Sequence, residues 1–191
     1  MANKTKSDYD KMSNDELVAY LDKLDINLFK SYTDGDTKIR YFLYKYGKPF
    51  AEALKGTGLF YAGVVGQSAY ESGFGRSEAT LKANNFAGVK YVAGKHPDFY
   101  EMLTKEKING KTVMVKQKFA KYPTSLEGIQ VFVDVLKLPK YNSARKVSTP
   151  EDQVYEIAKS GFATANPTGY KNDIKGIIRR IQNKIPIGKV I

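Results

Sequence analysis

Apolar residues recur at helical spacing along most of the chain. Residues 13–24 open with the capping-box pattern Ser13-Asn14-Asp15-Glu16 and continue with leucines on one face, which predicts a short helix. The same spacing predicts further helices at residues 37–54, 125–138, 149–160 and 167–183, and a short helix or turn at 77–83. Gly47 and Pro49 are expected to bend or split the helix at 37–54.

Residues 57–72 are apolar on almost every side, a pattern that predicts a buried central helix. Gly63 and Gly66 leave room for neighbouring helices to approach it closely. Gly73 and Gly75 mark its end, because glycine commonly terminates helices.

A hairpin is predicted at residues 98–120. Asn109-Gly110 favours a two-residue type I′ turn, and apolar residues alternate with polar ones after it. The predicted elements make an α+β fold that is mostly helical, with one core. We divide the chain into an N-terminal helical extension, residues 1–30, and a main domain, residues 31–191.

Composition excludes several classes of function. The chain has no Cys and one His, which rules out disulfides, thiolate metal sites, a Cys nucleophile and multi-His metal sites. It has no apolar stretch long enough to span a membrane, and residues 1–9 do not resemble a secretory signal. Its 31 Lys and Arg against 20 Asp and Glu attract polyanions: nucleic acid, an acidic membrane surface or an anionic bacterial wall. Charge alone does not choose among them, or exclude a merely soluble basic domain.

Glu71 ends the apolar helix and precedes a glycine-rich turn. Burial at such a place disfavours the ionised carboxylate and favours the protonated form, which is what a general acid needs. The alternative is a surface carboxylate paired with Arg76, and sequence position alone does not separate the two.

Glu106 is the second candidate carboxylate. With Asn109-Gly110 as the turn, Glu106 pairs with Val113 and shares the apolar face of Val115. The alternative is an exposed residue at the tip of the hairpin. Glu71 at a helix end and Glu106 on a hairpin would form a pair of carboxylates, an arrangement that is typical of enzymes that cleave glycosidic bonds.

Five motifs then occur in the order and spacing of one enzyme family. They lie at residues 67–77 (Q-x-A-x-E-S-G-W-G-x-S in the family), 84–90 (N-N-x-x-G-[IV]-K), 104–110 (T-x-E-x-x-N-G), 119–122 (F-R-x-Y) and 161–170 (G-Y-A-T-D-x-x-Y). From about residue 55 to 183 the chain resembles the bacterial and phage peptidoglycan glucosaminidases of glycoside hydrolase family 73. That family includes the flagellar rod hydrolase and several autolysins.

The resemblance implies a lysozyme-like fold with the hairpin beside the active-site cleft, residues 31–191 then being the catalytic domain. It implies cleavage of the β-1,4 bond between N-acetylglucosamine and N-acetylmuramic acid. Glu71 falls on the family's general acid and Glu106 on its second carboxylate. The candidate substrate-binding residues are Phe74, Asn84, Asn85, Tyr122 and Tyr170. For Asn84 and Asn85 the alternative is a turn. The resemblance implies no metal and no organic cofactor.

The sequence departs from the family pattern at several positions. Phe74 stands where Trp is usual, Ala120 where Arg is usual, and Val131 where Asp is frequent. Residues 165–169 replace a shorter turn, which leaves the register of Tyr170 open.

We therefore expect a peptidoglycan hydrolase, an endo-β-N-acetylglucosaminidase acting on the bacterial wall as a monomer, without nucleic acid and without stable membrane insertion. The alternatives are a muramidase or lytic transglycosylase of the same fold, a non-catalytic wall-binding module, and a nucleic-acid binder. The lack of a visible leader fits a phage lysin, a virion-carried hydrolase or an autolysin without its leader. Residues 1–30 are expected to be dispensable for chemistry, because the family match begins only near residue 55.

Overall fold

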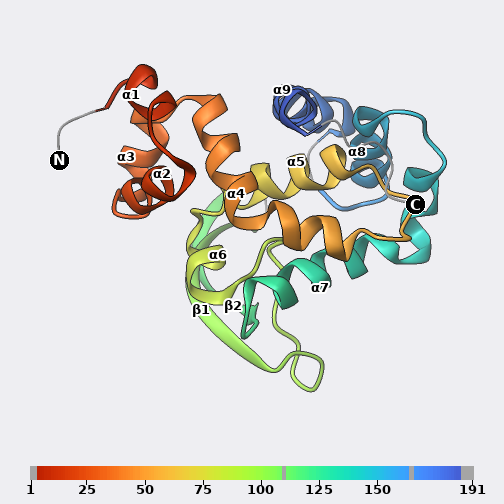
Figure 1. Cartoon of the computed structure of the whole chain (residues 1–191). Helices are drawn as coiled ribbons and strands as arrows, with labels where there is room; N and C mark the ends of the chain where they lie inside the picture. Colours follow the sequence, from red (N-terminus) through yellow and green to blue (C-terminus); the bar gives the residue numbers. More distant parts are fainter. Residues whose placement is uncertain (1–3, 109–110, 164–165, 186–191) are drawn as a thin grey trace.

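The computed structural model describes residues 4–108, 111–163 and 166–185, except for the side chains of residues 105–108. Most of this chain is helical, with one two-stranded sheet (Figure 1). In chain order the elements are α1 Lys6–Asp10, α2 Asn14–Leu21, α3 Ile26–Tyr32, α4 Gly35–Ala53, α5 Tyr61–Glu71, α6 Glu78–Ala83, β1 Asp98–Ile108, β2 Lys111–Lys121, α7 Ser125–Lys137, the 3₁₀ helix η1 Pro139–Arg145, α8 Pro150–Lys159 and α9 Pro167–Lys184. The predicted α+β, mostly helical class is confirmed. No helix in the described ranges is both long and apolar enough to cross a membrane.

The predicted central helix is α5, which is buried from Tyr61 to Ala69 and lies between α4 on one side and α8 and α9 on the other (Figure 1). Its glycines are points of close approach. A Cβ on Gly63 would lie 3.1 Å from the Pro150 carbonyl oxygen of α8, and a Cβ on Gly66 would lie 3.1 Å from Ile178 of α9. The close packing predicted at Gly63 and Gly66 is confirmed.

The helix α4 runs unbroken from Gly35 to Ala53 with Pro49 inside it, so the expected split does not occur. A proline in a helix interior costs about 3 kcal/mol, because it removes a hydrogen bond and crowds the preceding turn. Burying one large apolar side chain contributes about 1.5–3 kcal/mol. Phe42 and Phe50 are fully buried in the main core on the same helix, which offsets the cost of Pro49.

The hairpin has the register predicted from its sequence. Glu106 pairs with Val113, and Thr104 pairs with Val115. Burial alternates along β2, and Val113, Val115 and Phe119 lie on its more sheltered face. The predicted type I′ turn at Asn109-Gly110 lies outside the described residues.

The N-terminal helices form a small second core. Its buried members are Tyr9, Leu17, Leu21, Leu24, Phe29 and Tyr41, the last from α4. The predicted helix at 13–24 is present as α2, whereas α1 and α3 were not anticipated. The leucine stripe of this helix docks on the rest of the protein, since Tyr41 belongs to the same cluster.

Arg40 of α4 also holds these helices. Its Nε donates to the Asn14 side-chain oxygen at 2.7 Å, and its terminal nitrogens donate to the Tyr9 and Met12 carbonyls at 3.0 and 2.5 Å. The division at residue 30 would cut α3, which runs to Tyr32. We propose instead that the N-terminal unit comprises α1–α3 and ends at residues 33–34.

Substitutions at two glycines test the packing of α7 against the residues after α6. In Gly128→Ala the new Cβ would lie 1.8 Å from the Asn84 backbone oxygen, so α7 must shift. We expect the free energy of unfolding to fall by about 3 kcal/mol or more. The control is Gly169→Ala in α9, where a Cβ meets open space and should stabilise by up to about 1 kcal/mol. Urea unfolding measures both, and equal midpoints would contradict the packing described here.

Candidate active site

Glu71 is the last residue of α5, and the turn after it is held by backbone hydrogen bonds. The Phe74 N–H donates to the Ala69 carbonyl at 2.7 Å, and the Ser77 N–H donates to the Ser72 carbonyl at 2.8 Å. Glu71 itself is exposed. The expectation that Glu71 is desolvated by the protein is therefore wrong, because the apolar helix ends at the surface rather than inside the core.

Tyr170 of α9 lies directly against Glu71. Its hydroxyl donates to Glu71 Oε1 at 2.5 Å, and its side chain is 3% exposed. Burial raises the pKa of Tyr170 far above its usual range, and the neighbouring Glu71 charge raises it further. Tyr170 therefore stays protonated and remains a hydrogen-bond donor to Glu71. The inserted residues before α9 do not move Tyr170 away from the site.

A cavity of about 350 Å³ opens beside this pair. It is lined by Tyr70, Glu71, Ala87, Phe162, Ala163, Tyr170 and Asp173. The Tyr70 and Tyr170 rings meet edge to face at 5.8 Å, and the Tyr70 hydroxyl donates to Asp173 Oδ2 at 3.2 Å. Tyr70 is 41% exposed, so it presents an aromatic surface to solvent beside the cavity.

Sequence reasoning missed Tyr70 and Asp173. Their signal was available, because Asp173 follows Tyr170 by three residues and so lies on the same face of its helix. For Tyr70 the sequence signal was its position directly before Glu71. Its exposure, after a segment buried from Tyr61 to Ala69, is seen only in the structure.

The register places Glu106 on the sheltered face of the hairpin, opposite Val113. The side chain of Glu106 lies outside the described residues. Its role as the second carboxylate therefore stays a prediction.

Asn84 and Asn85 are used by the protein itself. Asn84 caps α6 in the left-handed region (φ 51°), and its amide donates to the Tyr122 carbonyl at 2.9 Å. Asn85 is 2% exposed, and its amide donates to the Val89 and Ala120 carbonyls at 2.9 and 2.8 Å. The bonds to Ala120 and Tyr122 tie the residues after α6 to the end of β2 and the residue that follows it, so both asparagines have a structural role in the unliganded chain.

Phe74 and Tyr122 do not line the cavity at Glu71. Phe74 packs against both hydrophobic cores from the turn after α5. Tyr122 is 5% exposed and lies beside Pro97, Asp98 and Pro123. Substrate contact by these two side chains stays a prediction.

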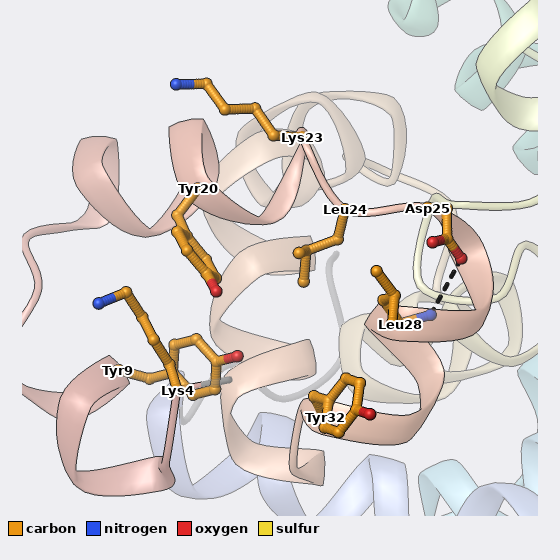
Figure 2. A pocket seen from close by; sticks show the side chains of 8 residues that line it. All are labelled: Lys4, Tyr9, Tyr20, Lys23, Leu24, Asp25, Leu28 and Tyr32. Atoms are coloured by element: carbon orange, nitrogen blue, oxygen red, sulfur yellow. Dashed lines mark hydrogen bonds between the residues drawn. The ribbon is translucent and has the colours of Figure 1, made fainter. Parts of the chain in front are cut away.

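A second cavity, of about 330 Å³, lies within the N-terminal unit (Figure 2). Lys4, Tyr9 and Tyr20 flank one side, and Leu24, Leu28 and Tyr32 flank the other. The one carboxylate that lines it, Asp25, accepts hydrogen bonds from the Asn27 and Leu28 N–H groups. Among the predicted site residues whose side chains the structure describes, none lines this cavity, whereas Glu71 and Tyr170 line the other, which is therefore the candidate active site.

A model of the glucosaminidase family, described as mannosyl-glycoprotein endo-beta-N-acetylglucosaminidase, matches residues 47–183. The chain belongs to the glucosaminidase family. The resemblance to glycoside hydrolase family 73 is confirmed. Glu71, Tyr170 and the whole cavity between them lie inside the matched range, whereas α1–α3 lie outside it.

Three relatives illustrate the match. Exo-glucosaminidase LytG of Bacillus subtilis (strain 168) is 31% identical over 124 residues, which cover 61% of this chain and 42% of LytG. The chain thus spans less than half the length of this curated relative.

The C-terminally truncated glycoside hydrolase domain of Salmonella typhimurium FlgJ is 28% identical, with a TM-score of 0.59 over 74% of this chain and 96% of that domain. The catalytic domain of the autolysin Auto from Listeria monocytogenes is 22% identical, with a TM-score of 0.64 over 80% and 89%. The latter likeness shows the fold alone, and the lysozyme-like fold is confirmed.

Tyr170→Phe tests the contact with Glu71. Removing a hydrogen bond to a charged group costs about 1.5–3 kcal/mol, so we expect the rate on purified wall to fall by about tenfold or more. Tyr44→Phe is the matched control, because Tyr44 donates to Asp15 at the same 2.5 Å distance on the surface of α4. Equal rates for the two variants would show that the Tyr170 hydroxyl does not contribute to the reaction.

Proposed function

We propose that this protein hydrolyses peptidoglycan at the β-1,4 bond between N-acetylglucosamine and N-acetylmuramic acid. The observation that carries the proposal is the pairing of an exposed carboxylate, Glu71, with a buried neutral donor, Tyr170, at a cavity with an aromatic wall. Membership of the glucosaminidase family supports the choice of bond.

Glu71 acts as the general acid in this proposal. Tyr170 occupies Oε1 as a donor, so the proton of the neutral acid resides on Oε2, where it can pass to the departing glycosidic oxygen. After transfer, the same Tyr170 hydroxyl stabilises the carboxylate that remains, since hydrogen bonds to charged acceptors are strong. Glu71 is exposed in the free protein, so its carboxyl group is accessible to a bound glycan strand.

Three routes could complete the reaction at the anomeric carbon, where positive charge develops. Glu106 activates a water molecule, Glu106 stabilises the positive charge directly, or the acetamido group of the substrate attacks the carbon. Asp173 offers another carboxylate at the cavity itself. We favour a role for Glu106 in either of its two forms, because the backbone position of Glu106 falls on the sheltered face of the hairpin.

The net positive charge of the chain is complementary to the anionic wall that we propose as its substrate. An anionic wall attracts a protein with a formal charge of +11, and the attraction increases the encounter rate at low salt. The site of action is therefore the bacterial cell wall, reached by phage-type release, virion delivery or export. We propose that the protein acts as a monomer and needs no cofactor.

Glu71→Gln should abolish lysis of purified wall while the protein stays folded. Loss of a general acid costs about 10²–10⁴-fold in rate. Glu52→Gln, an exposed carboxylate on α4, is the control and should keep the wild-type rate. Mass spectrometry of the released muropeptides should find N-acetylglucosamine at the new reducing ends. Muramic acid ends would indicate a muramidase, and 1,6-anhydromuramic acid ends a lytic transglycosylase.

Glu106→Gln should lower the rate by about tenfold or more, yet by less than Glu71→Gln, because water or the acetamido group partly substitutes. Glu101→Gln is the matched control, since Glu101 lies on the opposite face of the same strand and contacts Lys116 at the surface. A wild-type rate for Glu106→Gln together with a large loss for Asp173→Asn would transfer the role to Asp173.

A further inference from the structure

Arg76 closes the turn that follows Glu71, and it is almost completely buried, at 6% exposure. One terminal nitrogen of its guanidinium lies 3.2 Å from Asp22 Oδ1, and the other donates to the Leu24 carbonyl at 2.5 Å. The guanidinium also lies 5.6 Å from the centre of the Phe29 ring. All three partners belong to the N-terminal unit, outside the residues that match the family. The buried charge of Arg76 therefore depends on helices that the family match does not include.

The turn itself adopts an unfavourable backbone conformation. Gly73, Phe74 and Gly75 have φ angles of 57°, 58° and 78° in succession, and Phe74 carries a side chain that disfavours this region. A Cβ on Gly75 would lie 2.5 Å from the Tyr46 ring, so the turn also presses directly against α4. Such conformations persist only where the surrounding structure holds them.

Asp22 anchors Arg76 to the rest of the protein. Lys45 of α4 lies 3.0 Å from both oxygens of Asp22, and the Tyr41 hydroxyl donates to the same carboxylate. The Arg76 charge is thus compensated at a point where the N-terminal unit meets α4. Arg76 is the buried member of this pair, whereas the Asp22 side chain is 39% exposed. Removing Asp22 would leave the buried guanidinium without its carboxylate, which destabilises the local arrangement.

We infer that the N-terminal unit positions the catalytic turn through Arg76, with Asp22 and the Leu24 carbonyl as its anchors. Arg76 is a positioning residue: it contacts no reacting atom, and it fixes the turn that begins directly after Glu71. The inference rests on the proposed function of Glu71. It replaces the expectation that residues 1–30 are dispensable for chemistry, because a displacement of about 1 Å at a catalytic group can cost about 10²-fold in rate.

The test compares Arg76→Gln, Asp22→Asn and the double variant in the full chain, with kcat and KM measured on solubilised glycan strands. We expect each single variant to lower kcat by about tenfold or more, with KM within about threefold of wild type. The double variant should be no more than about twofold worse than the worse single one, because both single variants remove the same Arg76–Asp22 contact. Arg76→Lys keeps the charge and should recover part of kcat.

The control is Asp10→Asn, which breaks an exposed ion pair with Lys6 in the same N-terminal helices and should leave kcat unchanged. Hydrogen exchange gives a readout that does not depend on activity. Amides of residues 72–77 should exchange at least about tenfold faster in Arg76→Gln, whereas those of α8 should not change.

The outcomes separate the two proposals. Wild-type kcat for each folded molecule, with unchanged exchange at residues 72–77, would overturn the positioning role even if the variants melt earlier. A wild-type protein that releases no new reducing ends from the wall would overturn the proposed function, and faster exchange at the turn would then still support the structural link. If Arg76→Gln fails to fold, Asp22→Asn and Arg76→Lys decide the question by the same two measurements.

Discussion

Complete burial of α5 is the constraint on which the other features of the structure depend. A helix that is apolar on every side has to be covered on every side, and α4, α8 and α9 supply that cover. Only the C-terminal end of α5 reaches solvent, and Glu71 is the residue at that end. The buried central helix therefore presents a carboxylate at the surface from its C-terminal end.

The chemistry of Glu71 comes from elements that are far apart in the sequence. Tyr170 is separated from Glu71 by 99 positions and reaches it because α9 packs along α5 at Gly66. The same packing buries Tyr170, keeps its hydroxyl protonated and brings Asp173 to the cavity. Packing between two helices thus fixes both the position of Glu71, the proposed general acid, and the protonation state of its neighbour Tyr170.

The N-terminal unit shows a different kind of dependence. Arg76 lies inside the family match, whereas its partners Asp22 and Leu24 lie before it. A buried guanidinium without these partners would be costly, so the turn after Glu71 is expected to depend on the N-terminal helices for its stability. Phe74 reinforces the link, because it packs against both hydrophobic cores.

The sequence by itself determined the central helix, the hairpin register and the candidacy of Glu71, because these depend on repeats of two to four residues and on local turn chemistry. It did not reveal α1 and α3, which are short and become stable only by packing on α4. Only the tertiary structure decided that Glu71 is exposed and that the Asn85 side chain forms hydrogen bonds within the protein. It also decided that Arg76 pairs with Asp22 rather than with Glu71. These outcomes depend on which distant surfaces meet, and no periodic pattern along a single chain encodes that.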